Sequence, residues 1–150
     1  MPQSFSAIWF HVIFATRGRH PYLNREIRAH VHGYMHGVIT RMGGLASAIG
    51  GVEDHVHVMM RLPQDLSVAD CMRVLKSGTC GWIHGNFPEA REFAWQGGYS
   101  AFSVSVSQRS RVERYIAGQE DHHRVRTYPE ELREFFDRHG VPYDERDVRP

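Results

Sequence analysis

Residues 5–14 read FSAIWFHVIF, an almost unbroken run of apolar and aromatic side chains near the start of the chain. A strand with one solvent-facing side alternates apolar and polar residues, whereas a strand covered on both faces is apolar throughout. The run is also too short to span a membrane. It therefore predicts a central strand that is buried on both faces, around which the rest of the fold is arranged.

The rest of the chain alternates between helical and strand periodicities. Asn24 can cap a helix with apolar residues at spacings of three and four, and Ser67 with Asp70 resembles a capping box. The expected elements are strand 5–14, helix 24–43, strands 45–52 and 54–62, helix 67–84, strand 101–106, and helices 108–122 and 127–140. This β-α-β-β-α-β order predicts an α+β fold of the ferredoxin-like, split βαβ type. One antiparallel sheet would carry two helices on one face, with further C-terminal helices.

Length and cysteine content set the general class of protein. The chain has 150 residues, 41% of them hydrophobic, which suits a single globular domain over residues 1–150. The N-terminus has no basic segment before its apolar residues, so no secretory signal is predicted. Cys71 and Cys80 fall in one predicted helix and form neither a zinc nor a disulfide pattern. We therefore expect a cytoplasmic protein.

Net charge is only +1, but the charge is unevenly distributed. Residues 16–41 carry a net charge of +4 and residues 107–126 a net charge of +2, whereas residues 127–150 carry −3. This pattern predicts a basic body with an acidic C-terminal extension. The cations are 17 arginines and one lysine. Arginine suits phosphate contacts and stacking on bases, although a GC-rich genome would enrich it as well.

The stretch EDHVHVMM at residues 53–60 places two histidines in an apolar strand. Residues two apart in a strand point to the same face, so His55 and His57 would lie side by side. Val56 and its neighbours at even positions would pack the core from the other face. Two adjacent imidazoles suit a metal ion, which needs a third ligand. The alternative is a pair of histidines on a solvent-facing strand, or one core histidine and its neighbour.

A second polar group follows in RVERYIAGQEDHH, residues 111–123. Tyr115 and Gln119 are four residues apart and would share one helix face, with His123 one turn further. Gln119 offers a neutral oxygen for a metal, and Tyr115 offers a phenol that can act as a covalent nucleophile. The alternative is an ordinary core stripe of apolar residues with Gln119 as a solvated neighbour.

Together these residues resemble the single-tyrosine transposases of the IS200/IS605 family, which are HUH nucleases, and their REP-associated tyrosine transposase relatives. His55-Val56-His57 matches the His-hydrophobic-His motif, Tyr115 the nucleophile and Gln119 the third metal ligand. Further similarity lies in ATRGRHPY, LKSGT, GGYSAFSVS, YIAGQEDHH and HGVPYDERD. The resemblance extends over nearly the whole chain.

The resemblance implies a DNA transposase that cleaves and rejoins single-stranded DNA through a 5′-phosphotyrosine intermediate. A divalent metal, Mg²⁺ or Mn²⁺, would be held by His55, His57 and Gln119, although ligand type alone also allows Zn²⁺ or Ni²⁺. Tyr115 has a phenol of ordinary pKa about 10, so it needs help to ionise, from the metal or from a nearby imidazole such as His123.

The resemblance also implies binding partners. The family works as a homodimer, in which the tyrosine of one chain can complete the histidine pair of the other, and it recognises hairpins near the ends of DNA elements. No membrane association is expected. The residues expected to contact DNA are Arg17, Arg19, Arg73 and Lys76, with Trp95 and Tyr99 as rings for base stacking.

Three alternatives remain open on the sequence. A non-catalytic ferredoxin-like protein derived from a transposase would bind nucleic acid without any dependence on Tyr115. A metal-dependent phosphodiesterase acting on small nucleotides would need neither a basic surface nor a tyrosine. A structural metal domain would unfold when the metal is chelated.

Overall fold

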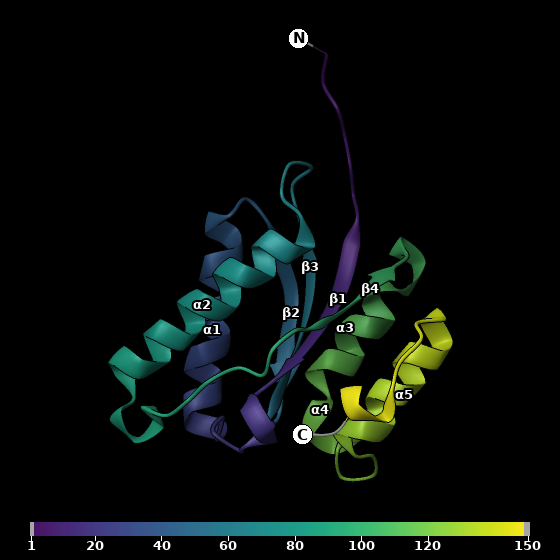
Figure 1. Ribbon diagram of the computed structural model, residues 1–150. Helices are drawn as coiled ribbons and strands as arrows, with labels where there is room; N and C mark the ends of the chain where they lie inside the picture. The colour runs from purple at the N-terminus through teal and green to yellow at the C-terminus, as the bar shows by residue number, and fades with distance from the viewer. Residues whose placement is uncertain (1, 149–150) are drawn as a thin grey trace.

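A computed structural model describes residues 2–148 and shows a four-stranded antiparallel sheet with helices on both faces (Figure 1). The strands are β1 (Trp9–Ala15), β2 (Leu45–Gly51), β3 (His55–Arg61) and β4 (Ser100–Val104), in the spatial order β2-β3-β1-β4. The helices are α1 (Arg25–Arg41), α2 (Val68–Asn86), α3 (Arg109–Ala117), α4 (Gln119–His122) and α5 (Tyr128–His139). The order of strands and helices confirms the predicted ferredoxin-like fold.

Strand β1 lies in the middle of the sheet, as the apolar run predicts, but it begins at Trp9 and not at residue 5. Trp9 pairs with Arg61 of β3 and Val104 of β4, which are the last residues of those strands. Residues 2–8 therefore have no neighbouring strand, and Phe5 and Ile8 are 88% and 57% exposed. This N-terminal segment extends away from the body of the molecule (Figure 1).

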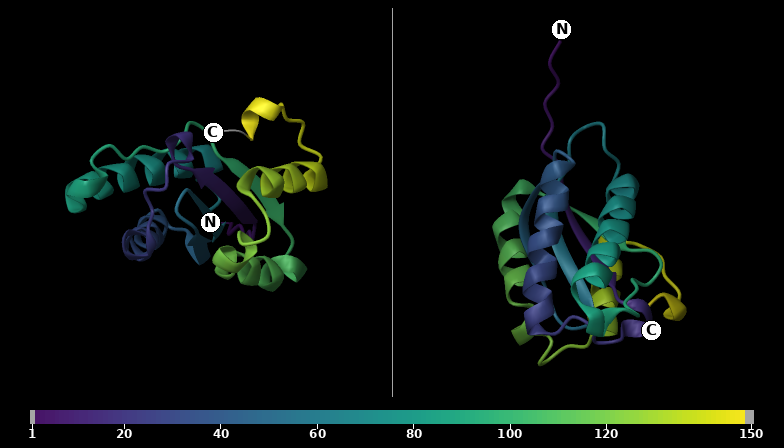
Figure 2. Two further views of the ribbon diagram at one scale, coloured as in Figure 1. Left: turned by 90° about the horizontal axis from the view of Figure 1, so that it is seen from below. Right: turned by 90° about the vertical axis from the view of Figure 1, so that its left-hand side faces the viewer.

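One face of the sheet is covered by α1 and α2, which lie side by side (Figure 2). Both helices begin where the sequence predicts. Asn24 accepts the backbone N–H of Ile27 at the start of α1, and Ser67 accepts that of Asp70 at the start of α2. The main apolar core lies between these helices and the sheet, and it includes Val12, Phe14, Val31, Val56, Val58, Met60 and Leu75.

The other face of the sheet carries α3, which approaches β2 unusually closely. A Cβ atom at Gly50 would lie only 2.1 Å from the backbone oxygen of Ile116. Glycine is therefore the residue that allows this contact. Ile116 also packs with Trp9 and Met59 in a separate apolar cluster. The contact sets the distance between the sheet and the helix that carries Tyr115.

The predicted continuous helix over residues 108–122 is wrong, because the structure divides it at Gly118. Helix α3 ends at Ala117 and the short α4 begins at Gln119, with Gly118 at φ −97° and ψ 22°. The N–H of Gly118 closes α3 on the carbonyl oxygens of Arg114 and Tyr115. Glycine has a low helix propensity, so an interruption here costs little.

The acidic extension folds back onto the same face as α3. Thr127 caps α5, and Gly140 ends it at φ 66°, as predicted. The helix packs on β1 and β4 through an apolar cluster of Ile13, Ala15, Phe102, Tyr128, Leu132, Phe136 and Val148. Residues 149–150 of the predicted extension lie outside the described part. No described helix is long and apolar enough to cross a membrane.

Candidate metal and tyrosine site

His55 and His57 lie side by side on the face of β3 that the C-terminal helices cover. Val56, Val58 and Met60 face the core under α1 and α2, which confirms the predicted division of the strand. Both imidazoles are 0% exposed, and their ring centroids are 5.2 Å apart. The alternative of two solvent-facing histidines is therefore wrong. Buried polar rings need polar partners. Here the partners are His11, Asp54, His123 and Glu131.

Four side chains from three separate segments bring possible ligand atoms together. These atoms belong to His55, His57, His123 and Glu131, and they all lie within 4.8 Å of one another. His57 Nε2 is 2.9 Å from Glu131 Oε1, and His55 Nε2 is 3.0 Å from His123 Nε2. A divalent ion with bonds of about 2.1 Å holds neighbouring ligand atoms about 3 Å apart. The spacing therefore fits a single ion.

The proton positions of two histidines support a cation at this place. His55 Nδ1 is 2.8 Å from Asp54 Oδ1, and His123 Nδ1 is 2.9 Å from the backbone oxygen of Arg126. These oxygens only accept, so each Nδ1 donates, and in its neutral form each ring presents a lone pair on Nε2. A metal ion would bind both lone pairs. Burial opposes a charged His55, but hydrogen bonds to Asp54 and Glu131 outweigh burial and raise the pKa of His55.

Gln119, the predicted third ligand, is buried beside these rings and only 1% exposed. Its Oε1 lies 3.0 Å from His123 Nε2, and its amide nitrogen donates to Glu131 Oε2 over 3.4 Å. The amide oxygen is therefore directed at the same place as the ring nitrogens. Imidazole nitrogens with amide and carboxylate oxygens form a set that suits a divalent cation.

His11 stands behind His57 in the middle of β1. Its Nε2 is 2.8 Å from His57 Nδ1, and the two rings lie 5.0 Å apart. Burial, together with the neighbouring His57, lowers the pKa of His11 to about 3. His11 therefore holds the His57 ring from behind through Nδ1, while His57 Nε2 faces Glu131 Oε1.

Tyr115 reaches the same cluster from α3. Its Oη contacts a carboxylate oxygen of Glu131 and lies 3.0 Å from His122 Nε2. Burial and the charge of Glu131 raise the pKa of Tyr115 well above its usual range. The sequence assigned the helping imidazole to His123, but the structure brings His122 to the phenol and directs His123 at His55. The rings of Tyr115 and His57 lie 5.8 Å apart within the described chain.

Glu131 is the residue that the sequence reasoning missed. It is 1% exposed, and its carboxylate contacts His57, His122 and His123. Burial opposes its ionisation, but the neighbouring imidazoles of His123, His55 and His57 outweigh burial and hold its pKa far below the usual range. Spacing offered a signal, because positions 128, 131, 132, 135 and 136 form one helical stripe. An acid within that apolar stripe has to be buried.

The four cations expected to contact DNA differ in how freely they can do so. Arg17 and Arg73 are exposed. The guanidinium of Arg19 lies 5.5 Å from the ring centre of Tyr128. Lys76 Nζ donates to two backbone oxygens of the segment before β4, at 2.8 and 2.7 Å. Lys76 therefore holds that segment in place as well as contributing charge.

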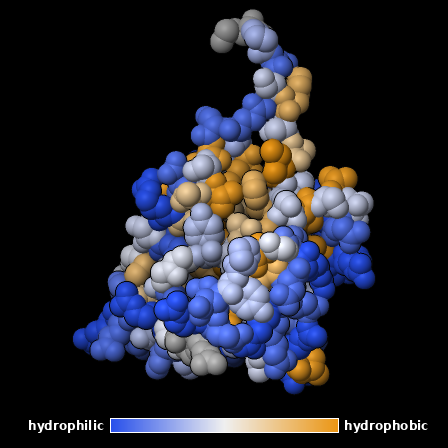
Figure 3. All heavy atoms as spheres, turned by 45° about the vertical axis from the view of Figure 1, so that its right-hand side comes forward, coloured by the Kyte–Doolittle hydropathy of each residue, from blue (hydrophilic) through white to orange (hydrophobic). Residues whose placement is uncertain are grey.

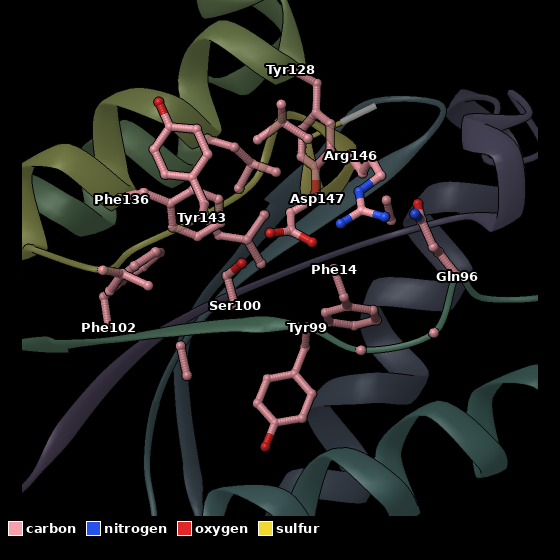
Figure 4. A pocket seen from close by; sticks show the side chains of 18 of the residues that line it. Phe14, Gln96, Tyr99, Ser100, Phe102, Tyr128, Phe136, Tyr143, Arg146 and Asp147 are labelled. Carbon is pink, nitrogen blue, oxygen red and sulfur yellow. The ribbon is translucent and has the colours of Figure 1, made fainter. Parts of the chain in front are cut away.

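Of the two aromatic residues expected to stack on bases, only Tyr99 is accessible, at 40% exposed. Trp95 is 7% exposed and packs edge-on against Phe14 and Phe93, so its ring offers no face to a base. A cavity of about 450 Å³ borders β4. In Figure 4, Tyr99 points to the opposite side of β4 from Tyr143.

Two larger cavities open onto the buried cluster. One of about 840 Å³ lies beside Tyr115, and its lining includes His11, Phe102, Arg111, Tyr115, His122, Arg126, Phe135 and Arg138. The other, of about 730 Å³, reaches His55 and His123, and its lining includes Arg19, Arg25, Arg124 and Arg126. Hydrophilic residues dominate the lower part of this side of the molecule (Figure 3). Both approaches to the site are therefore rich in arginine.

The fold and the site define an α+β protein that brings a tyrosine beside a candidate metal centre. The model of a family described as "Transposase IS200 like" matches residues 4–119, which is most of the chain. The chain therefore belongs to the IS200-like transposase family. A curated relative, the ISDra2 transposase TnpA of Deinococcus radiodurans, is 22% identical over 117 residues, covering 75% of this chain and 84% of the relative.

Solved structures show the same fold. A crystal structure described as a candidate transposase from Deinococcus radiodurans R1 superposes with a TM-score of 0.65 at 22% identity, covering 79% of this chain and 98% of that one. A REP-associated tyrosine transposase bound to a REP hairpin gives a TM-score of 0.59 at 16% identity, covering 82% of this chain and 74% of that one.

Proposed function

We propose that this transposase cleaves and rejoins single-stranded DNA with Tyr115 as the nucleophile. The observation that carries the proposal is the contact of Tyr115 Oη with Glu131 and His122 at the edge of the cluster formed by His55 and His57. A nucleophile within reach of proton acceptors and of a cation site is the arrangement that phosphoryl transfer needs. Residues 1–150 would act as one nuclease domain.

The proposed cleavage step forms a bond from Tyr115 Oη to phosphorus and breaks the bond from phosphorus to O3′. The phenolic proton passes to His122, whose Nε2 lies 3.0 Å from Tyr115 Oη, while Glu131 holds the phenol in place. The 5′-phosphate stays on the tyrosine, and O3′ takes up a proton to become a free 3′-OH. Attack of a 3′-OH on the phosphotyrosine reverses these steps, so rejoining needs no external energy source.

We further propose that His55, His57 and Gln119 hold the divalent ion, Mg²⁺ or Mn²⁺. When bound, such an ion polarises the scissile phosphate and offsets its developing charge. The burial of all three side chains keeps them in place before substrate arrives. Because each is neutral as a ligand, they leave the charge of the ion available to a phosphate.

The proposed substrate is single-stranded DNA that contains hairpins. A relative of the same fold is known bound to a REP hairpin, which supports hairpins as the recognised feature. The arginine-rich cavities support a path for the phosphate backbone past Tyr115. Exposed Arg17, Arg73 and Tyr99 would contribute contacts away from the reacting phosphate.

We also propose a homodimer, as the family resemblance implies. In the composite arrangement that the resemblance implies, the tyrosine helix of one copy would complete the histidine pair of the other. Within a single chain, Tyr115 contacts Glu131. Light scattering after size-exclusion chromatography would show whether two copies associate. A monomer that still forms a covalent adduct with DNA would separate the chemistry from dimerisation.

The proposal is tested by a covalent adduct between protein and DNA. Single-stranded oligonucleotides copied from the flanks of the gene are incubated with wild-type protein, with Tyr115→Phe and with Tyr34→Phe. Tyr34 lies on α1, on the opposite face of the sheet, and serves as the matched control. Each reaction contains Mg²⁺, Mn²⁺ or EDTA and is resolved on a denaturing gel. We expect an adduct with wild type and Tyr34→Phe, and none with Tyr115→Phe or with EDTA.

A different result points to the alternative function. Tight DNA binding by folded wild-type protein, without an adduct on any strand, would favour a non-catalytic nucleic-acid-binding protein derived from a transposase. An adduct that persists in Tyr115→Phe would assign the nucleophile to another residue. Either result would contradict the proposed mechanism while leaving the family assignment intact.

A further inference from the structure

Helix α5 brings a carboxylate into the cluster from outside the segment that matches the family. The match ends at residue 119, whereas Glu131 lies in the first turn of α5 and is 1% exposed. Within residues 2–148, its ion-pair partners are all histidines. Burying a carboxylate is costly unless a positive charge compensates it. The charge that compensates Glu131 must therefore be held among these histidines, as a proton on a ring or as a metal ion.

We infer that Glu131 is a fourth ligand of the divalent ion and the one that carries negative charge. The inference rests on the proposed ion site of His55, His57 and Gln119, and it adds a ligand that this chain supplies from its C-terminal extension. His123 completes the set, because its Nε2 faces the same place.

The distances fit a ligand role. Glu131 Oε1 is 2.9 Å from His57 Nε2 and 3.5 Å from His55 Nε2, and Glu131 Oε2 is 3.3 Å from His123 Nε2. These are the separations of neighbouring ligand atoms around one ion with bonds of about 2.1 Å. A residue that only filled space would not aim both carboxylate oxygens at ring nitrogens.

Charge balance favours the same role. Three imidazoles and an amide bring no negative charge, so a divalent ion held by them alone would place two positive charges in a buried site. Glu131 offsets one of these charges and leaves the other for a phosphate. Carboxylate oxygen is also a ligand that Mg²⁺ and Mn²⁺ prefer.

The same carboxylate links the ion to the nucleophile. Glu131 Oε1 faces His57, while Oε2 contacts Tyr115 Oη. If one oxygen of Glu131 binds the ion and the other accepts the hydrogen bond of Tyr115 Oη, the carboxylate bridges the ion and the phenol. Glu131 would thereby set the distance between nucleophile and scissile phosphate, which is a positioning role as well as a binding one.

Helix α5 is anchored firmly enough to hold a ligand. Thr127 caps its first turn, and Leu132 and Phe136 pack with Ile13 and Phe102 beneath it. The carboxylate therefore sits on a rigid element and not on a loop, as a precise metal ligand requires.

The inference is tested by measuring Mn²⁺ affinity directly, from the electron paramagnetic resonance signal of unbound Mn²⁺ during titration. The variants are Glu131→Gln and, as a matched control, Glu130→Gln. Glu130 precedes it on the same helix, is exposed, and loses the same charge on substitution. We expect Glu131→Gln to bind Mn²⁺ more than about tenfold more weakly, since disturbing even outer partners of a metal costs about 10–100-fold. Glu130→Gln should bind as wild type does.

Folding is followed separately, by near-ultraviolet circular dichroism and the unfolding midpoint in EDTA. If Glu131→Gln fails to fold, Glu131→Asp provides the second test. Aspartate keeps the charge but shortens the side chain by one methylene. A ligand role predicts weaker Mn²⁺ binding by Glu131→Asp, whereas a role limited to charge predicts unchanged binding.

Each remaining outcome overturns the inference in a recognisable way. Equal affinity of wild type and Glu131→Gln would leave the proposed ion site standing but remove Glu131 from it. Tighter binding by Glu131→Gln would show that the carboxylate competes with the ion. Failure of wild type itself to bind Mn²⁺ would overturn the proposed ion site together with its fourth ligand.

Discussion

At the residue scale, side chains behind the possible ligands decide which atoms face the ion. Asp54 accepts from His55 Nδ1, and the backbone oxygen of Arg126 accepts from His123 Nδ1. Each of these bonds fixes a ring tautomer and leaves Nε2 free to bind a cation. The chemistry of the site therefore depends on residues that touch neither the metal nor the substrate.

Asp54→Ala isolates this effect. The side chain of Asp54 holds His55, while its backbone oxygen accepts from Thr16 N over 2.9 Å and remains in the variant. Removing the carboxylate frees the His55 ring to change tautomer, so we expect Mn²⁺ affinity to fall by about 10–100-fold. The fold should persist. Titration with Mn²⁺, with circular dichroism as a control for folding, measures both. Unchanged affinity would mean that the tautomer of His55 is set by other contacts.

The sequence predicts the part of the site that follows from local periodicity. A spacing of two residues on a strand places His55 beside His57, and a spacing of four residues on a helix places Gln119 near Tyr115. The contacts of Glu131 and His122 depend on how α5 and α4 pack against the sheet, which no spacing within one element encodes. The helical stripe of α5 indicates that Glu131 is buried, but the partners of Glu131 and His122 became visible only in the folded chain.

At the element scale, capping residues and glycines predict most boundaries, and the exceptions have tertiary causes. Asn24, Ser67 and Thr127 cap helices where expected. The first strand begins at Trp9 because Trp9 pairs with the last residues of both neighbouring strands. An apolar run in the sequence does not show where the neighbouring strands end. The break at Gly118 arises within an otherwise helical pattern, where glycine only weakens the prediction.

Gly50→Ala tests how the position of α3 controls activity. The new Cβ would lie 2.1 Å from the backbone oxygen of Ile116, so α3 has to move away from β2. We expect the free energy of unfolding to fall by about 1–3 kcal/mol, as for other overpacked contacts. The displaced Tyr115 should also give less covalent adduct with DNA. Denaturant unfolding and the denaturing gel measure the two effects.

The matched control for this substitution is Gly81→Ala. A Cβ at Gly81, in α2, meets nothing within 4 Å. Alanine there should stabilise the helix by up to about 1 kcal/mol without changing adduct formation. A Gly50→Ala protein as stable and active as wild type would show that α3 can shift without disturbing Tyr115.

At the scale of the whole molecule, the acidic extension is not a separate negatively charged surface, because it folds against the sheet and contributes side chains to the site. Its Glu131 lies among histidines, and its Glu134 pairs with Arg126 and Arg138 at the cavity beside Tyr115. The net charge of the segment therefore does not describe its local roles, since Glu131 joins the histidine cluster and Glu134 pairs with two arginines. Arg111 lines the same cavity, is exposed, and forms no ion pair within the described residues.

Arg111 is accordingly the arginine we expect to meet the phosphate backbone next to the reacting position. Arg111→Ala should weaken binding to single-stranded DNA, and it should reduce the slope of log affinity against log salt by about 0.7, the value for one phosphate contact on a single strand. Arg91→Ala removes the same charge from an exposed position in the segment between α2 and β4 and serves as the control. Fluorescence anisotropy across a series of salt concentrations gives both slopes. If the two variants lose the same slope, DNA is held by diffuse charge and not by a defined track past Tyr115.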